Sequence, residues 1–306
     1  MDTKIKKLIT HNGSFHADDV FTCAALSLML EKENTNFEII RTRDEEKIKI
    51  GDYVFDVGGI YDAEHNRFDH HQPGGAGRRI PSKEGEIGIE YSSFGLIWKK
   101  FGSKLCENQE SADIIDKRLV TPIDAGDNGI DLFKSTTNTS PYLLQQIFFA
   151  IQPTWREEAS EDKAFIQSVE IAKIILAREI IQAQDAVFAE ETIVSVYNNT
   201  ADKRIIVFDR HYPFEYILPN LPEPLFAIYQ RKIDGSWGIR TVAKVYGTFD
   251  NRKNFPKAWV GLRDAELQKI TGVSDAVFCH RGLFLAVAKS KEGALKLAKL
   301  ALEASA

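Results

Sequence analysis

Cysteine is scarce in this 306-residue chain, which has three, and no two of them form a CxxC pair. Cys23, Cys106 and Cys279 are odd in number and widely spaced. That pattern excludes a disulfide framework or a cysteine zinc site and favours a reducing, cytoplasmic compartment. No apolar run reaches the about 18 residues that a membrane-spanning helix needs, so no membrane partner is expected. The first residues include lysines but no apolar segment, so no signal peptide is predicted.

A large excess of one charge is also missing. The net charge of −5 gives no overall signature of nucleic-acid binding. The charges are unevenly distributed, however: residues 1–190 hold 22 Lys+Arg and 32 Asp+Glu, or −10, whereas residues 191–306 hold 17 and 12, or +5. An acidic first part suits cations and a basic second part suits phosphates, although chance asymmetry explains the split equally well.

Short apolar segments alternate with helical ones in the first half of the chain, which predicts a doubly wound, mostly parallel sheet. The expected strands lie within residues 6–13, 36–43 and 52–59, and the expected helices within 17–33, 91–102 and 110–123. The helix at 91–102 is expected to begin at a serine cap and to end at Gly102.

The second half of the chain predicts a smaller, mixed α/β domain. Apolar residues at steps of three and four predict a helix within 157–190. Strands are expected at 191–198 and 203–209, a hairpin at 225–243 that turns at Asp234-Gly235, and a final helix at 289–305. The predicted organisation is therefore a first domain at 1–155, a linking helix at 156–190 and a second domain at 191–306.

Residues that commonly bind metal ions occur in four motifs, three of them next to predicted strands. The motifs are "ITHNGSFHADDV", "YVFDVGG", "FDHHQ" and "IDAGDNG". They supply His11, His16, Asp18 and Asp19, then Asp56, then Asp69, His70 and His71, and finally Asp124 and Asp127. Loops after the C-terminal ends of parallel strands meet in one crevice, so these motifs are expected to converge. Asp19 by itself is expected only to stabilise a helix start.

The ligand types indicate the chemistry. Carboxylates and imidazoles without thiolates suit Mn²⁺ or a similar divalent cation. Several carboxylates also suit two metal ions that share a bridging Asp. Two metals roughly 3.5–4 Å apart can hold both the attacking water and the leaving oxygen of a phosphoryl displacement. A bound metal lowers the pKa of water, so hydroxide becomes available near neutral pH.

Together these motifs resemble those of the DHH phosphoesterase superfamily, which includes RecJ-type exonucleases and family II inorganic pyrophosphatases. The strings "THNGSFHADDVF", "DVGGIYD", "RFDHHQ", "SSFGLIW", "DAGDNGI" and "EGAL" more closely resemble the melanocyte proliferating gene protein family, over nearly the whole chain. The resemblance implies a DHH-type catalytic first domain and a substrate-binding second domain. It also implies a manganese-dependent 3′-5′ exonuclease that acts on RNA or short oligonucleotides through metal-activated water, with Mg²⁺ or another divalent cation as an alternative metal.

The resemblance also implies residue roles. The implied metal ligands are His11, Asp18, the bridging Asp56, His70, and either Asp124 or Asp127, with Asp124 preferred as the nearer match to a strand end. His71 would face the substrate phosphate and Asp69 would orient the histidine pair. His16 stands where most members of the superfamily have Asp. It would therefore either ligate metal or contact phosphate, and the less anionic site would hold one metal more weakly.

Substrate contacts are expected from basic residues. The candidates are Arg78 and Arg79, which end the glycine-rich loop at 73–79, and His280, Arg281 and Lys289 in the second domain. Ordinary surface charge is the alternative interpretation for all five. Phe255 and Trp259 would stack on a base or pack in the core.

Two rival functions remain open from the sequence. One is a phosphoesterase that acts on a small nucleotide, a dinucleotide or pyrophosphate, because metal motifs contact only the phosphate. The other is a metal-containing RNA- or protein-binding module without turnover, which the unusual His16 keeps open. The sequence predicts no oligomeric state.

Overall fold

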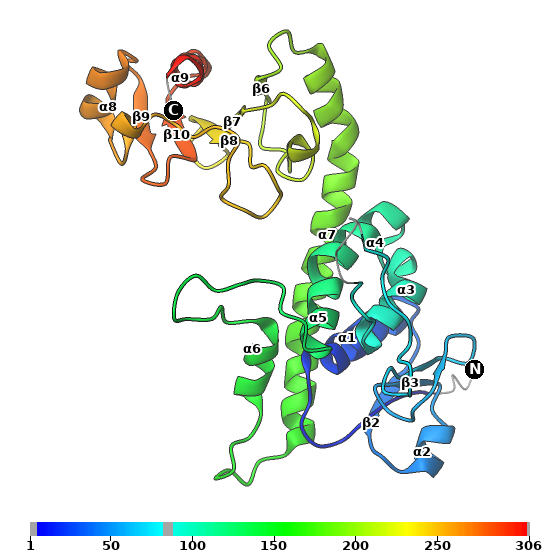
Figure 1. Cartoon of the computed structure of the whole chain (residues 1–306). Coiled ribbons are helices and arrows are strands. Elements are labelled where there is room, and N and C mark those ends of the chain that lie inside the picture. The colour runs from blue at the N-terminus through cyan, green and yellow to red at the C-terminus, as the bar shows by residue number, and fades with distance from the viewer. Residues whose placement is uncertain (1–4, 82–87, 305–306) are drawn as a thin grey trace. The chain divides into compact units, whose positions relative to one another are not determined.

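The computed structural model describes residues 5–81 and 88–304. The chain divides into two compact units, Met1–Gln184 and Asp185–Ala306. Each unit contains one five-stranded sheet among its described residues (Figure 1). The prediction of an α/β fold, with a mostly parallel sheet first and a mixed one second, is confirmed. No helix in the described ranges is both long and apolar enough to cross a membrane.

The sheet of the first unit has the strand order β2-β1-β3-β5-β4. Its strands are β1 (Lys6–Thr10), β2 (Phe37–Arg41), β3 (Tyr53–Phe55), β4 (Tyr61–Asp62) and β5 (Arg67–Phe68). The pairs β1–β2, β1–β3 and β3–β5 are parallel, and only the edge strand β4 is antiparallel to its neighbour. Three adjacent parallel strands, β1, β3 and β5, therefore end at the same edge of the sheet.

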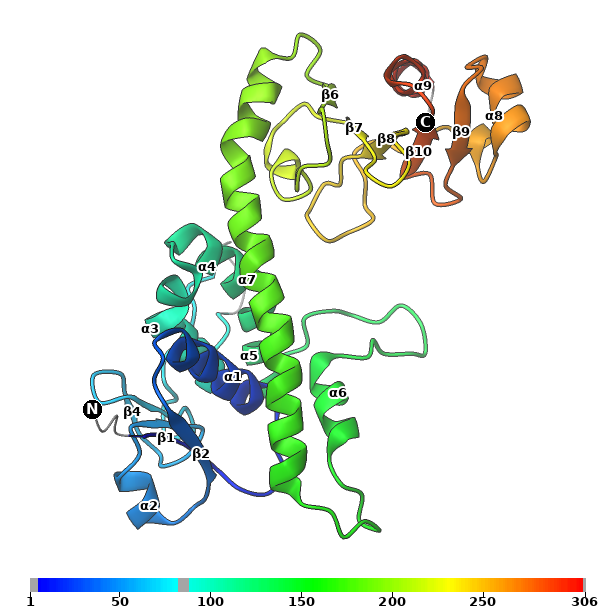
Figure 2. The same ribbon diagram turned by 180° about the vertical axis from the view of Figure 1, so that it is seen from behind.

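Helices pack around this sheet in the first unit. They are α1 (Ala17–Lys32), α2 (Glu45–Lys49), α3 (Ser93–Cys106), α4 (Gln109–Ile115), the π-helical turn η1 (Asp116–Val120), α5 (Thr121–Asp127), α6 (Leu144–Ile151) and the first part of α7 (Glu161–Asn199). Most of α1 is buried, and both views show it lying beside α3 and α5 (Figure 1 and Figure 2). Phe21 of α1 packs against Phe94 of α3, with ring centroids 5.4 Å apart.

The expected end of α3 at Gly102 is wrong, because the helix continues to Cys106. Gly102 lies directly against the indole of Trp98, where any Cβ would be 2.9 Å from the ring. The glycine therefore makes room for a buried tryptophan within the helix instead of ending it.

The second unit begins within α7, which continues to Asn199. Its strands are β6 (Ile205–Val207), β7 (Phe226–Gln230), β8 (Trp237–Thr241), β9 (Ala276–Cys279) and β10 (Leu285–Ala288), in the order β6-β7-β8-β10-β9. Its further helices are η2 (Leu218–Asn220), η3 (Lys257–Trp259), α8 (Asp264–Thr271) and α9 (Lys291–Glu303). The predicted hairpin is present, since β7 and β8 are antiparallel and Gly235 adopts the left-handed conformation that its turn needs.

The strand predicted at 191–198 is wrong, because these residues form the last turns of α7. Ile193 and Tyr197 are both buried and are four residues apart, so they occupy one face of the helix. Burial of that face outweighs the strand preference of the β-branched residues in "ETIVSVYN".

Candidate metal centre

The ends of the three adjacent parallel strands carry the first three metal-type motifs. His11 follows β1, Asp56 follows β3, and residues 69–71 follow β5. The expected convergence therefore occurs for residues far apart in the sequence. Asp56 adopts a left-handed backbone, with φ of 53°, at the point where the chain leaves the sheet. Asp and Asn tolerate this conformation better than most other residues that have a side chain.

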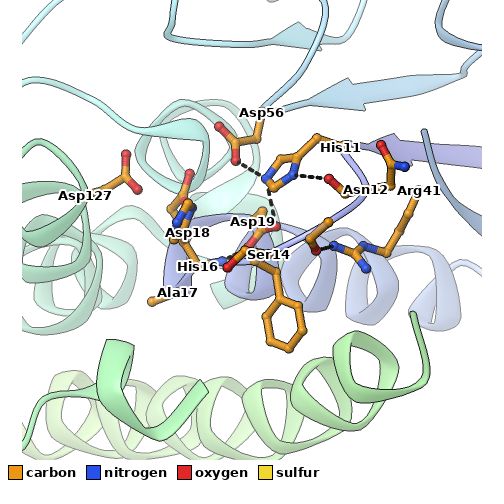
Figure 3. Close-up of polar contacts among 12 residues, drawn as sticks. His11, Asn12, Ser14, His16, Ala17, Asp18, Asp19, Arg41, Asp56 and Asp127 are labelled. Atoms are coloured by element: carbon orange, nitrogen blue, oxygen red, sulfur yellow. Dashed lines mark hydrogen bonds and ion pairs between the residues drawn. The ribbon is translucent and has the colours of Figure 1, made fainter. Parts of the chain in front are cut away.

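His11 lies between two buried carboxylates (Figure 3). Its Nε2 is 3.1 Å from Asp56 Oδ2 and 3.3 Å from Asp19 Oδ2, while its Nδ1 is 3.2 Å from the carbonyl oxygen of Asn12. Burial alone would lower the pKa of His11, but the two neighbouring carboxylates outweigh it and raise the pKa to about 10. In the metal-free protein His11 is thus an imidazolium held between Asp19 and Asp56.

His70 makes the corresponding contacts on the other side of Asp56. Its Nε2 is 3.3 Å from Asp56 Oδ1, 3.3 Å from Asp127 Oδ2 and 3.9 Å from Asp18 Oδ2. The two oxygens of Asp56 therefore face two different histidines, Oδ2 toward His11 and Oδ1 toward His70. This is the arrangement expected of a carboxylate that bridges two neighbouring positions.

The carboxylates in the centre repel one another. Burial raises the pKa of Asp18 well above its usual range, and the neighbouring acids raise this pKa further. Burial also raises the pKa of Asp127. Burial acts in the same direction on Asp56, but the His11 and His70 imidazoles hold the pKa of Asp56 well below its usual range. Asp18, Asp56 and Asp127 thus lie close enough for their charges to oppose one another.

Asp69 organises the DHH turn. Its Oδ1 accepts hydrogen bonds from the backbone N–H of His70 at 2.8 Å and of His71 at 3.2 Å, and lies 2.8 Å from His71 Nδ1. Its Oδ2 accepts from the N–H of Gly59 at 2.6 Å. The contact with Asp69 raises the pKa of His71, whose side chain is 63% exposed. His71 is therefore the solvent-facing histidine of the pair.

Within the described residues, three groups of side chains could each hold a metal ion. They are His11, His16 and Asp56, then Asp56, His70 and His71, and then His16, Asp18 and Asp127. Adjacent groups share a residue, either Asp56 or His16. Both Asp18 oxygens, Asp56 Oδ1 and His70 Nε2 are buried and form no hydrogen bond with a residue that the structure describes. Such unsatisfied nitrogen and oxygen atoms fit a divalent cation.

Asp124 lies apart from these groups. It is in the middle of α5 and not at a strand end, so the reason for preferring it over Asp127 does not hold. Its Oδ1 accepts from Ser92 Oγ at 2.5 Å and from the Gly95 N–H at 3.0 Å, and its Oδ2 pairs with Arg79. A Cβ at Gly95 would collide with this carboxylate, so the glycine of "SSFG" lets the two elements approach.

The predicted substrate-contact residues are placed in different surroundings. Arg79 is largely buried and pairs with Asp116 as well as Asp124, while Arg78 is exposed and pairs with Glu90. In the second unit Arg281 and Lys289 are exposed, and the ring of half-buried His280 lies 4.3 Å from that of Phe284. Phe255 and Trp259 are buried and stacked on each other in the core of that unit.

Sequence reasoning gave Asp19 too small a role. Its Oδ1 accepts from the backbone N–H of His16 at 2.8 Å and so stabilises the start of α1, as expected. Its Oδ2 also holds His11, which a helix-start role does not predict. The histidine that follows the first predicted strand was the available signal, since a nearby acid is a frequent partner for a metal-binding imidazole.

The sequence motifs also give no indication of two further features of the site, the short helix α6 and Arg41. In α6, Gln145 Oε1 accepts from the Ala17 N–H at 2.6 Å, and directly after α6 Gln152 Nε2 donates to the Phe15 carbonyl at 2.7 Å. Arg41 donates to the Gly13 carbonyl and to Asp162 of α7. The loop between β1 and α1 is thus fixed by partners remote in sequence, for which the sequence carries no local signal.

The fold and the site together define the class of the protein. It is an α/β protein in which adjacent parallel strands end in a carboxylate–imidazole cluster suited to divalent cations. The family follows from comparison with known proteins. The profile of the family described as "Uncharacterised protein family (UPF0160)", with MYG1 exonuclease in its short name, matches residues 7–302. The chain belongs to this MYG1 family, which confirms the resemblance drawn from the sequence motifs.

Individual relatives agree with the family assignment. The chain is 30% identical to "MYG1 exonuclease" of Bos taurus, with 96% of this chain and 84% of the relative covered. It is 29% identical to that of Homo sapiens, with 96% and 85% covered. It is 32% identical to a "MYG1 protein" of Chlamydia pneumoniae, with 96% of each covered. The membership and the metal-type cluster confirm the prediction of a metal-dependent hydrolase of the phosphoesterase or nuclease kind.

Solved structures give a weaker likeness. RecJ of Thermus thermophilus in complex with Mn²⁺ is 13% identical with a TM-score of 0.28, and the alignment covers 98% of this chain and 52% of that one. An exonuclease RecJ bound to manganese is also 13% identical, with a TM-score of 0.26 and coverage of 98% and 91%. These TM-scores are too low to support an argument.

Proposed function

We propose that the protein is a manganese-dependent 3′-5′ exonuclease that hydrolyses RNA or short oligonucleotides. The observation that carries the proposal is the position of Asp56, whose two oxygens face His11 and His70 within overlapping groups of metal-type ligands. The names of the mammalian relatives support nuclease activity. The mixture of imidazole nitrogens and carboxylate oxygens supports Mn²⁺, with Mg²⁺ as the alternative.

The residues of the centre divide into two sets that meet at Asp56. His11, His16 and Asp56 would hold one metal, and Asp18, His70 and Asp127, which lie beside Asp56, would hold the other. When bound, such cations act as Lewis acids that lower the pKa of water and polarise a phosphate oxygen. His16 belongs to two of the three groups, which supports a role as ligand over contact with phosphate alone.

The exposed His71 is the proposed proton donor. Asp69 holds its Nδ1 and raises its pKa, so the imidazolium form persists to higher pH than for a free histidine. The ring is fixed at one nitrogen and exposed to solvent, so its Nε2 can donate a hydrogen bond to a phosphate oxygen or to the leaving oxygen. Asp69 acts through His71 and through the backbone of the turn, and is a positioning residue.

The second unit supplies the proposed phosphate contacts. Arg281 and Lys289 are exposed there, and their charges belong to the basic part of the chain. We assign phosphate contact to these two residues and to His280. Arg79 contributes less to this role, because both of its partners are carboxylates of the first unit and its side chain is only 14% exposed.

The test is cleavage of RNA labelled at its 5′ end, with Mn²⁺ present, by the wild type and by Asp56→Asn. Shortening of the labelled strand one nucleotide at a time is expected from the wild type only. Asp62→Asn is the matched control, because Asp62 pairs with His65 and belongs to none of the three groups. Equal cleavage by wild type and Asp56→Asn would contradict the mechanism.

The same assay separates the alternatives. Release of the labelled nucleotide as the first product would reverse the proposed polarity. Hydrolysis of dinucleotides or pyrophosphate, with longer strands intact, would favour the small-substrate alternative. Tight RNA binding without cleavage under Mn²⁺ or Mg²⁺ would favour a binding module.

A further inference from the structure

Helix α6 places an exposed aromatic ring against the metal centre. Phe149 is 48% exposed, and its ring centroid lies 6.0 Å from that of His16 at an interplanar angle of 78°. His16 itself belongs to two of the three metal-type groups. We propose that Phe149 is a stacking surface for the base of the nucleotide whose phosphodiester lies at the metal centre. This inference rests on the proposed function and names a substrate contact for the same site.

The position of Phe149 is fixed by its neighbours. The preceding residue, Phe148, is fully buried and packs on Phe21 of α1, with ring centroids 5.8 Å apart. Because successive residues on a helix point about 100° apart, burial of Phe148 turns Phe149 outward. The outward ring lies beside His16 and not on a remote surface.

Hydrogen bonds hold α6 to the loop that carries His16. Gln145 Oε1 accepts from the Ala17 N–H at 2.6 Å, directly after His16. Gln152 Nε2 donates to the Phe15 carbonyl at 2.7 Å, directly before His16, and Gln152 Oε1 accepts from Ser14 Oγ at 2.7 Å. The two ends of α6 are thus attached on either side of His16. This attachment pre-organises the ring relative to the metal centre, which lowers the entropic cost of stacking.

The chemistry of α6 favours a base over the other parts of a nucleotide. The helix, "LQQIFFAI", contains no charged residue, so it offers no ion pair to a phosphate. A phenyl ring has no hydrogen-bonding group and therefore accepts any base by its π face. Such a contact suits an enzyme that removes successive nucleotides without regard to sequence. The contact with His16, a residue of the proposed catalytic centre, also favours a substrate base over a second copy of the chain or a partner protein.

The experiment compares two RNA substrates that differ only in their bases. One is an ordinary oligonucleotide, and the other has abasic residues at its 3′ end. With the first substrate, Phe149→Ala is expected to lower kcat/KM by roughly 5- to 100-fold, mainly through KM, as for loss of one base-stacking contact. With the abasic substrate, wild type and Phe149→Ala are expected to be equal. Phe149→Trp is expected to restore cleavage of the ordinary substrate, and Phe149→Leu is not.

Trp155→Ala is the matched control. Trp155 is also an aromatic residue of the same segment and is 88% exposed, but its described aromatic contact is with Arg156 and not with the metal centre. It is expected to cleave both substrates like the wild type. An equal loss for Phe149→Ala on both substrates, or no loss on either, would overturn the stacking role. A change of oligomeric state with unaltered KM would assign Phe149 to a protein interface instead.

Failure of the proposed function has a separate signature. If the wild type cleaves neither substrate with Mn²⁺, the nuclease proposal fails. Fluorescence anisotropy of the labelled oligonucleotide still tests the stacking contact in that case. Weaker binding of the ordinary strand by Phe149→Ala, with equal binding of the abasic strand, is the expected result, and equal binding of both strands would overturn it.

Discussion

Asp19 Oδ2 lies 3.3 Å from His11 Nε2, while Asp19 Oδ1 accepts the hydrogen bond from the His16 N–H that stabilises the start of α1. One carboxylate therefore joins the beginning of a buried helix to the orientation of a metal-type imidazole. Burial raises the pKa of Asp19, and its contact with His11 opposes that shift. The helix start and the metal centre are coupled through this residue.

Substitution of Asp19 by Asn is expected to weaken metal binding without unfolding the protein. The amide oxygen can still accept from the His16 N–H, but the charge that orients His11 is lost. We expect the affinity for Mn²⁺ to fall by roughly 10- to 100-fold, as for other partners of metal-ligating histidines. Isothermal titration with Mn²⁺ measures the change.

The control for this substitution is Asp44→Asn, at the start of α2. Asp44 also caps a helix, since its Oδ1 accepts from the Glu46 N–H, but it belongs to none of the metal-type groups. It is expected to leave the Mn²⁺ affinity unchanged. Equal affinities for Asp19→Asn and the wild type would show that His11 does not depend on Asp19.

Metal binding is expected to strengthen as the pH rises. His11 has a pKa raised to about 10 in the metal-free protein, so a metal ion must displace its proton. If this single proton dominates, the apparent Mn²⁺ affinity should increase by about tenfold per pH unit between pH 6.5 and 8. Mn²⁺ titrations at several pH values and at constant ionic strength measure this dependence of affinity on pH. A pH-independent affinity would contradict the protonated His11.

The raised pKa of His11 also predicts how the stability of the metal-free protein depends on pH. The pKa of His11 is higher in the folded chain than the 6.5 of an ordinary histidine. Its contribution to the free energy of unfolding is therefore fully present below pH 6.5 and is lost as the pH rises through about 10. The stability difference between wild type and His11→Gln should narrow over that window in chemical denaturation. A difference that widens with pH would contradict this sign.

Addition of Mn²⁺ is expected to raise the melting temperature, and a chelator is expected to reverse the rise. A metal present at 100 times its Kd stabilises the folded protein by about 2.7 kcal/mol. Differential scanning fluorimetry should show an increase of roughly 5–10 °C. Asp18→Asn should abolish the increase. Because burial and neighbouring acids raise the pKa of Asp18, its charge is costly at pH 7, and the metal-free variant should be at least as stable as the wild type.

Replacement of Asp124 by Asn and replacement of Asp127 by Asn are expected to have different effects on stability and cleavage. Asp124→Asn leaves the largely buried Arg79 with Asp116 as its remaining carboxylate and should reduce stability by about 2–3 kcal/mol. Asp127→Asn removes a carboxylate that lies 3.3 Å from His70 Nε2 and should abolish cleavage with little loss of stability. Denaturation and Mn²⁺ titration of both variants separate the two roles. Loss of metal binding in Asp124→Asn alone would reverse the assignment.

The parts of the site that the sequence predicts best are those that follow parallel strands. His11, Asp56 and His70 each come shortly after a short apolar segment, and the rule that such ends converge brings them together. The choice between Asp124 and Asp127 could not be made in this way, because both lie in a helix. That choice depends on how one turn of α5 is oriented about the helix axis. Packing and Arg79, a residue remote in sequence, set this orientation.

Other features depend on contacts that leave no local pattern. The predicted strand at 191–198 has strand-like residues, but its buried face continues that of the preceding helix. Helix α6 contains no motif, and its importance comes from two glutamines that bond to Ala17 and Phe15 more than 100 residues earlier. Sequence patterns report periodicity and local chemistry, and neither specifies which remote loop a glutamine will meet.

The left-handed backbone of Asp56 restricts which residues can occupy the position where the two histidines meet. A residue with a Cβ held at positive φ costs roughly 1–2 kcal/mol, and glycine is free of that cost. Glycine at this position would, however, also remove the carboxylate that faces His11 and His70, and with it a predicted metal ligand. The longer acid in Asp56→Glu would keep the charge but accept the conformation less readily than asparagine does. The fold thus leaves Asp56 few substitutes, and only the native aspartate combines a tolerated backbone with a carboxylate of the right reach.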